Sequence, residues 1–131
     1  MRVLLIEDDS ATAQGIELML KSEGFNVYTT DLGEEGIDLG KIYDYDLILL
    51  DLNLPDMSGI EILRQIKENQ YLKSAPVVVL TTADDSQEIN RCYELGCNVY
   101  ITKPVNYESF ANAIRQLGLF FSVIQVPQAG T

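Results

Sequence analysis

The hydrophobic residues of the chain fall into five short apolar runs separated by longer segments with helical spacing. The runs occupy residues 3–6, 26–29, 47–50, 77–80 and 99–101. Most of them are continuous rather than alternating, which is typical of strands covered on both faces of a parallel sheet. The pattern therefore predicts five buried strands, with room for a helix between consecutive strands.

Apolar residues spaced three and four positions apart predict the helices. The stripes are, in chain order, Ala13, Ile16 and Leu20; Ile62, Leu63 and Ile66; Ile89, Cys92 and Tyr93; and Phe110, Ala113, Ile114, Leu117 and Phe121. The first stripe stops at Gly24, and the third follows a capping pattern from Asp85 to Glu88 and ends near Gly96. The glycine-punctuated segment 33–40 has the weakest helical pattern.

Five strand–helix units with short connections indicate one α/β domain. Right-handed crossovers between parallel strands favour an open, doubly wound five-stranded sheet with helices on both faces, in the order 2-1-3-4-5 of flavodoxin-like folds. Such a sheet carries its site at the carboxyl ends of the strands, near strands 1 and 3. We expect residues 1–118 to form this domain and residues 119–131 to form an apolar extension of the last helix and a tail.

Composition narrows the range of functions. The 131 residues carry 9 Lys and Arg against 20 Asp and Glu, and a net charge of −11 makes nucleic acid and anionic membranes poor direct partners. The sequence contains no His, which excludes Ser-His-Asp sites and His-ligated zinc within it. Cys92 and Cys97 fit no metal or redox motif and are interpreted as reduced core thiols. The first apolar run is too short for a signal peptide or membrane anchor, so we expect a cytoplasmic protein.

Polar residues of complementary chemistry follow four of the strands. They are Glu7, Asp8 and Asp9; Asp51; Thr81 and Thr82; and Lys103 with Pro104. Carboxylates crowded together repel one another by roughly 1 to 4 kcal/mol per pair at 4 Å, so such a cluster favours a bound cation, and Mg²⁺ prefers oxygen ligands. A metal, an ammonium and a hydroxyl together suit a phosphoryl group. Asp51 is the expected carboxylate nucleophile.

Each of these residues also has an ordinary structural interpretation. Glu7 to Asp9 could cap the following helix, Asp51 could form a turn before Pro55, and Lys103 could simply face solvent. Thr81 could be an ordinary strand-end hydroxyl. The convergence of four strand ends on one edge of the sheet favours the functional interpretation for the set.

Four motifs together resemble the receiver domain of bacterial two-component response regulators, from Val3 to about Leu117. They are Glu7-Asp8; Leu49-Leu50-Asp51 with Leu54-Pro55-Asp56-Met57-Ser58-Gly59; Leu80-Thr81-Thr82-Ala83; and Ile101-Thr102-Lys103-Pro104. The resemblance implies that Asp51 is the phosphoacceptor and that Mg²⁺, or Mn²⁺ in its place, is held by Glu7, Asp8, Asp51 and the main-chain carbonyl of Asn53. It further implies a catalytic ammonium at Lys103, a switch pair of Thr81 and Tyr100, and a cis Lys103-Pro104 peptide bond.

The resemblance also implies a function. Asp51 would take a phosphoryl group from a sensor histidine kinase or a histidine phosphotransfer protein, and the domain would catalyse its own phosphorylation and dephosphorylation. The shift of Thr81 and Tyr100 would then change the surface formed by the fourth helix, fifth strand and fifth helix. Three alternatives remain. A haloacid-dehalogenase-like phosphatase usually has an Asp where this chain has Asn53, and a flavin-binding domain would have its cofactor phosphate repelled by Glu7 to Asp9. The third alternative is a phosphorylation-dead interaction module.

The end of the chain predicts self-association. Residues 119–126 are too apolar for a solvated terminus, so they either pack back on their own sheet or meet another chain. Of the two, we expect a homodimer through the last helix and this tail. The candidate contacts are Phe110, Leu117, Phe120, Phe121, Val123 and Ile124. The part up to about Leu63 resembles receivers of alphaproteobacterial cell-cycle transcription factors, and the part from Ala75 resembles stand-alone receivers paired with bacterial phytochrome kinases, which motivates the hypothesis of a chimera.

Overall fold

The computed structural model describes residues 2–22, 24–40, 42–52, 54, 56, 58–69, 72, 75–81, 86–103 and 106–116. For residues 86, 88, 107 and 114–116 it describes the main chain alone.

Strands and helices alternate along the chain as the hydrophobic pattern predicts. The strands are β1 (Arg2–Ile6), β2 (Asn26–Thr30), β3 (Leu47–Asp51), β4 (Val77–Thr81) and β5 (Val99–Thr102), and the helices are α1 (Ser10–Ser22), α2 (Gly33–Gly40), α3 (Gly59–Glu68), α4 (Ser86–Glu94) and α5 (Tyr107–Gln116). All strand pairs are parallel and their order is β2-β1-β3-β4-β5, which confirms the predicted topology. The weakly patterned segment 33–40 is also a helix.

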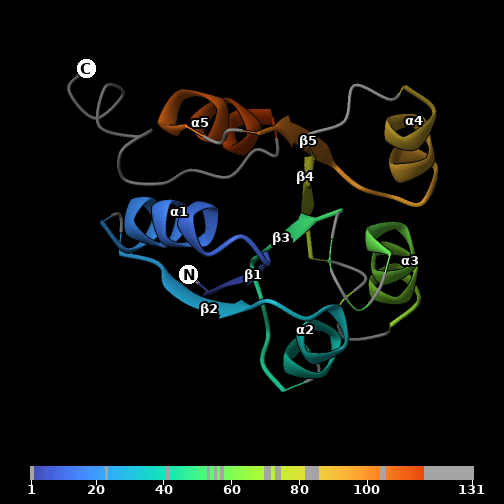
Figure 1. The fold of residues 1–131 in the computed structure, drawn as a ribbon, viewed down its shortest axis with the longest axis horizontal. Helices are drawn as coiled ribbons and strands as arrows, with labels where there is room; N and C mark the ends of the chain where they lie inside the picture. The colour runs from blue at the N-terminus through green and yellow to red at the C-terminus, as the bar shows by residue number, and fades with distance from the viewer. Residues whose placement is uncertain are drawn as a thin grey trace.

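Two hydrophobic clusters explain why the central strands β1, β3 and β4 are almost continuously apolar, whereas the edge strands β2 and β5 are partly exposed. Helices α1 and α5 lie on one face of the sheet, and α2, α3 and α4 lie on the other (Figure 1). On β1, Val3 and Leu5 enter the cluster beneath α1 and α5, whereas Leu4 and Ile6 enter the cluster beneath the other three helices. Because both faces of the sheet are covered, both sets of alternating side chains must be apolar.

Helix α4 ends in a turn that buries both cysteines. Gly96 has φ 103°, and the main-chain N–H of Cys97 donates to the carbonyl of Cys92 at 3.0 Å. Both cysteines are buried thiols outside any disulfide, as predicted, and burial raises the pKa of Cys97 to about 12. The third predicted stripe is wrong in one residue. Tyr93 is 45% exposed, and its ring packs edge to face on that of Tyr100 at the surface.

Among the described residues, no helix has both the length and the apolar character that a membrane-spanning helix requires.

Candidate metal centre

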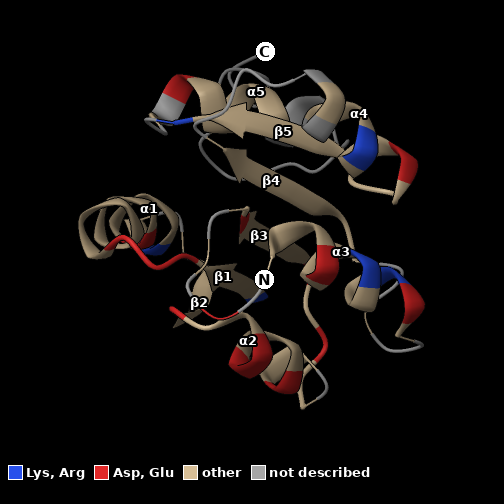
Figure 2. Cartoon of the chain, turned by 45° about the vertical axis from the view of Figure 1, so that its right-hand side comes forward, with Lys and Arg blue, Asp and Glu red and all other residues tan. Residues whose placement is uncertain are grey.

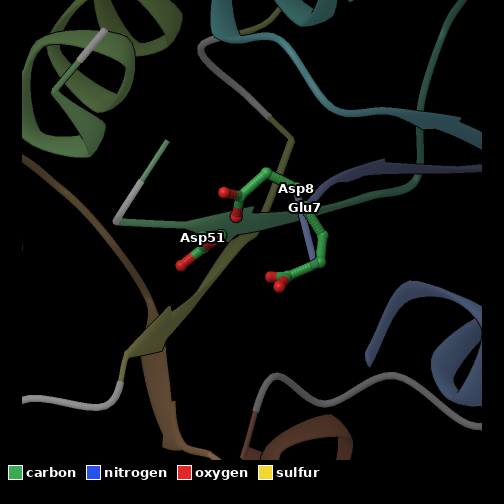
Figure 3. Close-up of side chains that lie close together, drawn as sticks. All are labelled: Glu7, Asp8 and Asp51. Atoms are coloured by element: carbon green, nitrogen blue, oxygen red, sulfur yellow. The ribbon is translucent and has the colours of Figure 1, made fainter. Parts of the chain in front are cut away.

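Three carboxylates meet beyond the carboxyl ends of β1 and β3. Glu7 and Asp8 follow the last residue of β1, and Asp51 is the last residue of β3. One carboxylate oxygen from each of the three lies within 4.8 Å of those of the other two. Figure 3 shows the three side chains gathered around the same space. The parallel pairing of β1 with β3 produces this convergence, since it aligns the ends of the two strands.

Two of the three carboxylates are buried. The residues Glu7 and Asp51 are 2% and 1% exposed, whereas Asp8 is exposed. Burial raises the pKa of Glu7, against the lowering effect of its hydrogen bond to Lys103. Oxygen Oε2 of Glu7 is buried and has no hydrogen-bond partner within the described part of the chain. A buried acceptor left in this state suits an added cation.

Lys103 is the cation that the protein itself supplies to this cluster. Its Nζ lies 2.7 Å from Oε1 of Glu7 and 3.3 Å from Oδ1 of Asp51, and its side chain is 14% exposed. Burial acts to lower the pKa of the ammonium, but the hydrogen bond to Glu7 and the charge of Asp51 outweigh it and raise that pKa. The alternative in which Lys103 merely faces solvent is therefore wrong.

One ammonium does not balance three carboxylates. With all groups ionised, Glu7, Asp8, Asp51 and Lys103 carry a net charge of about −2, which is the charge that a divalent cation neutralises. The oxygen-only donor set is the one that Mg²⁺ prefers. Further acidic residues lie on α2 (Figure 2). The residues present therefore fit a bound Mg²⁺.

Asp9 belongs to helix α1 and not to the carboxylate cluster. Its carboxylate accepts a hydrogen bond from the Thr12 hydroxyl, and its carbonyl accepts one from the N–H of Ala13 at 2.9 Å. The hydrogen bond from Thr12 is the main reason why the pKa of Asp9 is lowered. The capping interpretation is thus correct for Asp9 and wrong for Glu7, although the two residues are separated by one position.

Thr81 and Tyr100 lie in different environments. Thr81 is buried at the end of β4, where its carbonyl accepts a hydrogen bond from the main-chain N–H of Lys103 at 2.9 Å. Tyr100 lies on β5, is 37% exposed and packs against Tyr93 with ring centroids 6.1 Å apart. In this arrangement the aromatic ring of the predicted pair is at the surface.

Several predicted residues lie outside the described part of the chain. They are Asn53, Pro104, Leu117, Phe120, Phe121, Val123 and Ile124. The carbonyl ligand, the cis peptide bond and most dimer contacts therefore stay predictions. Phe110 is described, and its proposed role as a dimer contact is wrong. It is 3% exposed and packs in the core beneath α1 and α5.

The sequence reasoning assigned no role to Asp56, which the structure places in contact with the start of α2. Its carboxylate accepts hydrogen bonds from the N–H groups of Gly33 and Glu34. A signal was present in the sequence, because Leu32, which precedes this helix, has no side-chain acceptor to cap it.

The comparisons with known proteins agree with this geometry. The family model described as "Response regulator receiver domain" matches residues 3–115. The cell cycle transcriptional regulator CtrA of Caulobacter vibrioides is 64% identical over 104 residues, which cover 79% of this chain and 44% of the regulator. The chain thus spans about half the length of the curated relatives it matches.

Solved structures give the same result over almost the whole chain. A receiver domain from Rhodospirillum rubrum is 49% identical, with a TM-score of 0.75, and the match covers 95% of this chain and 96% of that one. The receiver domain of a sensor histidine kinase from Pseudomonas aeruginosa is 29% identical, with a TM-score of 0.79 and coverage of 89% and 97%. Its structure has a magnesium ion coordinated in the active site cleft.

The hypothesis of a chimera gains no support from the cell-cycle regulators. Their similarity is not confined to the first half, because 104 aligned residues exceed half of the 131 residues. The division into two differently related parts stays a prediction.

Proposed function

Since the chain belongs to the response regulator receiver domain family, we propose that it accepts a phosphoryl group on Asp51 with Mg²⁺ held by Glu7, Asp8 and Asp51. The observation that carries this proposal is the position of Lys103, whose Nζ lies between the buried carboxylates of Glu7 and Asp51. We include the Asn53 carbonyl as a further ligand. Mn²⁺ is expected to substitute for Mg²⁺, because both accept oxygen ligands.

The chemistry follows from the charges around Asp51. A carboxylate oxygen of Asp51 attacks phosphorus in line, the bond to the donor nitrogen breaks, and its electron pair leaves with the imidazole. The ammonium of Lys103 attracts the phosphoryl oxygens, and the Thr81 hydroxyl donates to one of them once it turns toward the acceptor. A bound Mg²⁺ would neutralise the charge that gathers on the phosphoryl group.

The donor is a phosphohistidine outside these 131 residues or a small phosphodonor. The 131 residues contain no His. We assign the donor to a sensor histidine kinase or a histidine phosphotransfer protein, as the family implies, and infer a cytoplasmic location, where kinases have access to ATP.

The response to phosphorylation is expected on the surface of α4, β5 and α5. There Tyr93, Tyr100, Ser109 and Asn112 line part of a groove of about 400 Å³. Movement of Thr81 toward the phosphoryl group vacates space into which Tyr100 turns, so the two arrangements differ in the shape of this groove. We propose that a homodimer forms through this surface together with the apolar residues 117–124.

Incubation with acetyl phosphate and MgCl₂, followed by intact mass spectrometry, tests the proposal. We expect one added phosphoryl group on the wild-type chain, restored by MnCl₂ after chelation and absent without a divalent metal. The matched variant Asp51→Asn keeps the size of the side chain but removes the carboxylate, so it should remain unlabelled. Full labelling of Asp51→Asn would refute the assignment of the acceptor.

A further inference from the structure

Asp56 joins the loop after β3 to the N-terminus of α2. Its Oδ1 accepts a hydrogen bond from the N–H of Gly33 at 2.8 Å, and its Oδ2 accepts one from the N–H of Glu34 at 3.1 Å. The residues are 22 and 23 positions apart in sequence. One exposed carboxylate thus connects two elements that flank the metal centre.

Helix α2 needs this external partner because it lacks a local cap. The carbonyl of Leu32 accepts the first helical hydrogen bond, from Gly36, so Leu32 occupies the capping position. A leucine side chain has no oxygen to accept the first N–H groups of a helix. The carboxylate of Asp56 supplies two acceptor oxygens, and its negative charge suits the positive end of the helix.

The start of α2 is also tied to the end of β1. The N–H of Glu7 donates to the carbonyl of Thr30 at 3.0 Å, and the hydroxyl oxygen of Thr30 accepts the N–H of Leu32 at 3.2 Å. Gly36 faces the side chains of Ile6 and Thr30, where a Cβ atom would come within 2.6 Å of Ile6. The N-terminal end of α2, which Asp56 contacts, is therefore fixed to the end of β1, directly before and at Glu7.

The loop between β3 and α3 is held at its base as well. The N–H of Gly59 donates to the carbonyl of Leu52 at 3.1 Å, and a Cβ atom at Gly59 would lie 2.3 Å from the Cα of Leu52. Leu52 directly follows Asp51. The loop is thus anchored at its base beside the acceptor and, through Asp56, at a second point on α2.

We propose that Asp56 is a positioning residue, which holds the loop after Asp51 at the distance from Glu7 that a shared Mg²⁺ requires. It touches neither the metal nor the phosphoryl group, and it acts through the first turn of α2. The inference rests on the proposed function in taking the three carboxylates as metal ligands. Groups that orient metal ligands typically change metal affinity by about 10- to 100-fold when they are removed.

Calorimetric titration with MgCl₂ alone separates a positioning role of Asp56 from a purely electrostatic effect and from simple capping of α2. We expect the Kd for Mg²⁺ of Asp56→Ala to rise about tenfold, and that of Asp56→Asn to rise clearly less, since Asn keeps one acceptor oxygen. Both variants lose the same charge, so a purely electrostatic effect would weaken them equally. Asp38→Ala, which removes an exposed carboxylate from the same helix, should leave the Kd within about twofold of the wild type, because an exposed charge is screened.

The titration is run where thermal unfolding shows each variant to be folded. An unchanged Kd in Asp56→Ala, with only a lower Tm, would overturn the proposal and leave Asp56 as a simple helix cap. Equal weakening in Asp56→Ala and Asp56→Asn would overturn it as well. If Asp56→Ala does not fold, the test rests on Asp56→Asn. A Kd for Mg²⁺ of Asp56→Asn equal to that of Asp38→Ala would then count against a positioning role of Asp56. Wild-type chain that binds Mg²⁺ but takes no phosphoryl group from acetyl phosphate would refute the proposed function and leave the role of Asp56 intact.

Discussion

Arg2 and Lys103 are cationic side chains at opposite ends of the same sheet, and their surroundings differ. At the amino end, the guanidinium of Arg2 lies over the rings of Tyr43 and Tyr28, 4.7 and 5.8 Å from their centroids, and donates to the carbonyl of Asp44 at 3.2 Å. At the carboxyl end, the ammonium of Lys103 lies between two buried carboxylates.

The difference lies in the remaining charge. The partners of the Arg2 guanidinium are neutral rings and a carbonyl, whereas Lys103 leaves negative charge uncompensated at Glu7, Asp8 and Asp51. The described contacts of the Arg2 guanidinium include no cluster of carboxylates, so the amino end does not favour a divalent cation. The carboxyl end keeps an excess of negative charge, and under the proposed function a divalent cation from solution balances it.

Substitution of Gly59 should damage the carboxyl end most. In Gly59→Ala the new Cβ atom would clash with the main chain of Leu52, which cannot move without shifting Asp51. We expect a loss of about 3 kcal/mol or more in the free energy of unfolding, measured with urea. Gly15→Ala is the control, because nothing lies within 4 Å of that Cβ atom in helix α1, and it should gain about 0.5 to 1 kcal/mol. A mild effect of Gly59→Ala would contradict the tight base of the loop.

Removal of the ammonium should destabilise the metal-free protein strongly. Lys103→Met leaves Glu7 and Asp51 buried without their cation, at an expected cost of about 3 kcal/mol at pH 7. Burial raises the pKa of Glu7 in the folded state above the ordinary value of 4.5, so protonation of Glu7 favours the folded state. The variant should therefore recover stability as the pH falls toward 4.5. Urea unfolding in EDTA from pH 8 to pH 5 measures both effects. A stability that stays flat across this range would contradict the role of the buried carboxylates.

Addition of Mg²⁺ should stabilise the wild type through the carboxyl end alone. At a concentration 100 times the Kd, the gain is about 2.7 kcal/mol, visible as a higher Tm. Asp8→Asn removes one ligand charge from an exposed position, so it should fold normally and lose most of this gain. An equal rise of Tm in Asp8→Asn would show that Mg²⁺ binds elsewhere.

Removal of the cationic side chain at the amino end should have the smallest effect on stability. Arg2→Met removes a cation that faces neutral groups, so we expect a loss of about 1 kcal/mol, with no change between pH 5 and 8 and none in the response to Mg²⁺. The measurement is the same urea series used for Lys103→Met. A pH dependence matching that of Lys103→Met would remove the distinction between the two ends.

Sequence pattern predicted the sheet because its rule is simple. The central strands β1, β3 and β4 are covered on both faces and are therefore almost continuously apolar, and parallel connections leave few possible orders. Parallel sheets of this kind carry their sites at the carboxyl ends of the strands, and that rule identified Glu7, Asp8, Asp51 and Lys103, which the structure brings together.

Contacts between distant segments limited what the sequence could predict. Asp9 and Glu7 are both acidic and nearly adjacent, and the contact of Glu7 with Lys103, 96 positions away, distinguishes the cluster from the cap. Phe110 fits a surface stripe as well as a core stripe until α1 is seen to cover it. Asp56 serves a helix more than 20 residues earlier, and the missing cap at Leu32 indicates the need for an acceptor but not which residue supplies it.

The location of the phosphoryl group tests the central claim most directly. The chain is treated with acetyl phosphate and MgCl₂, reduced with borohydride, which converts an aspartyl phosphate to homoserine, and digested for peptide mass spectrometry. The account predicts conversion at Asp51 alone, and only when a divalent metal is present. Conversion at Asp8 or Asp9, or conversion at Asp51 that persists in EDTA, would contradict it.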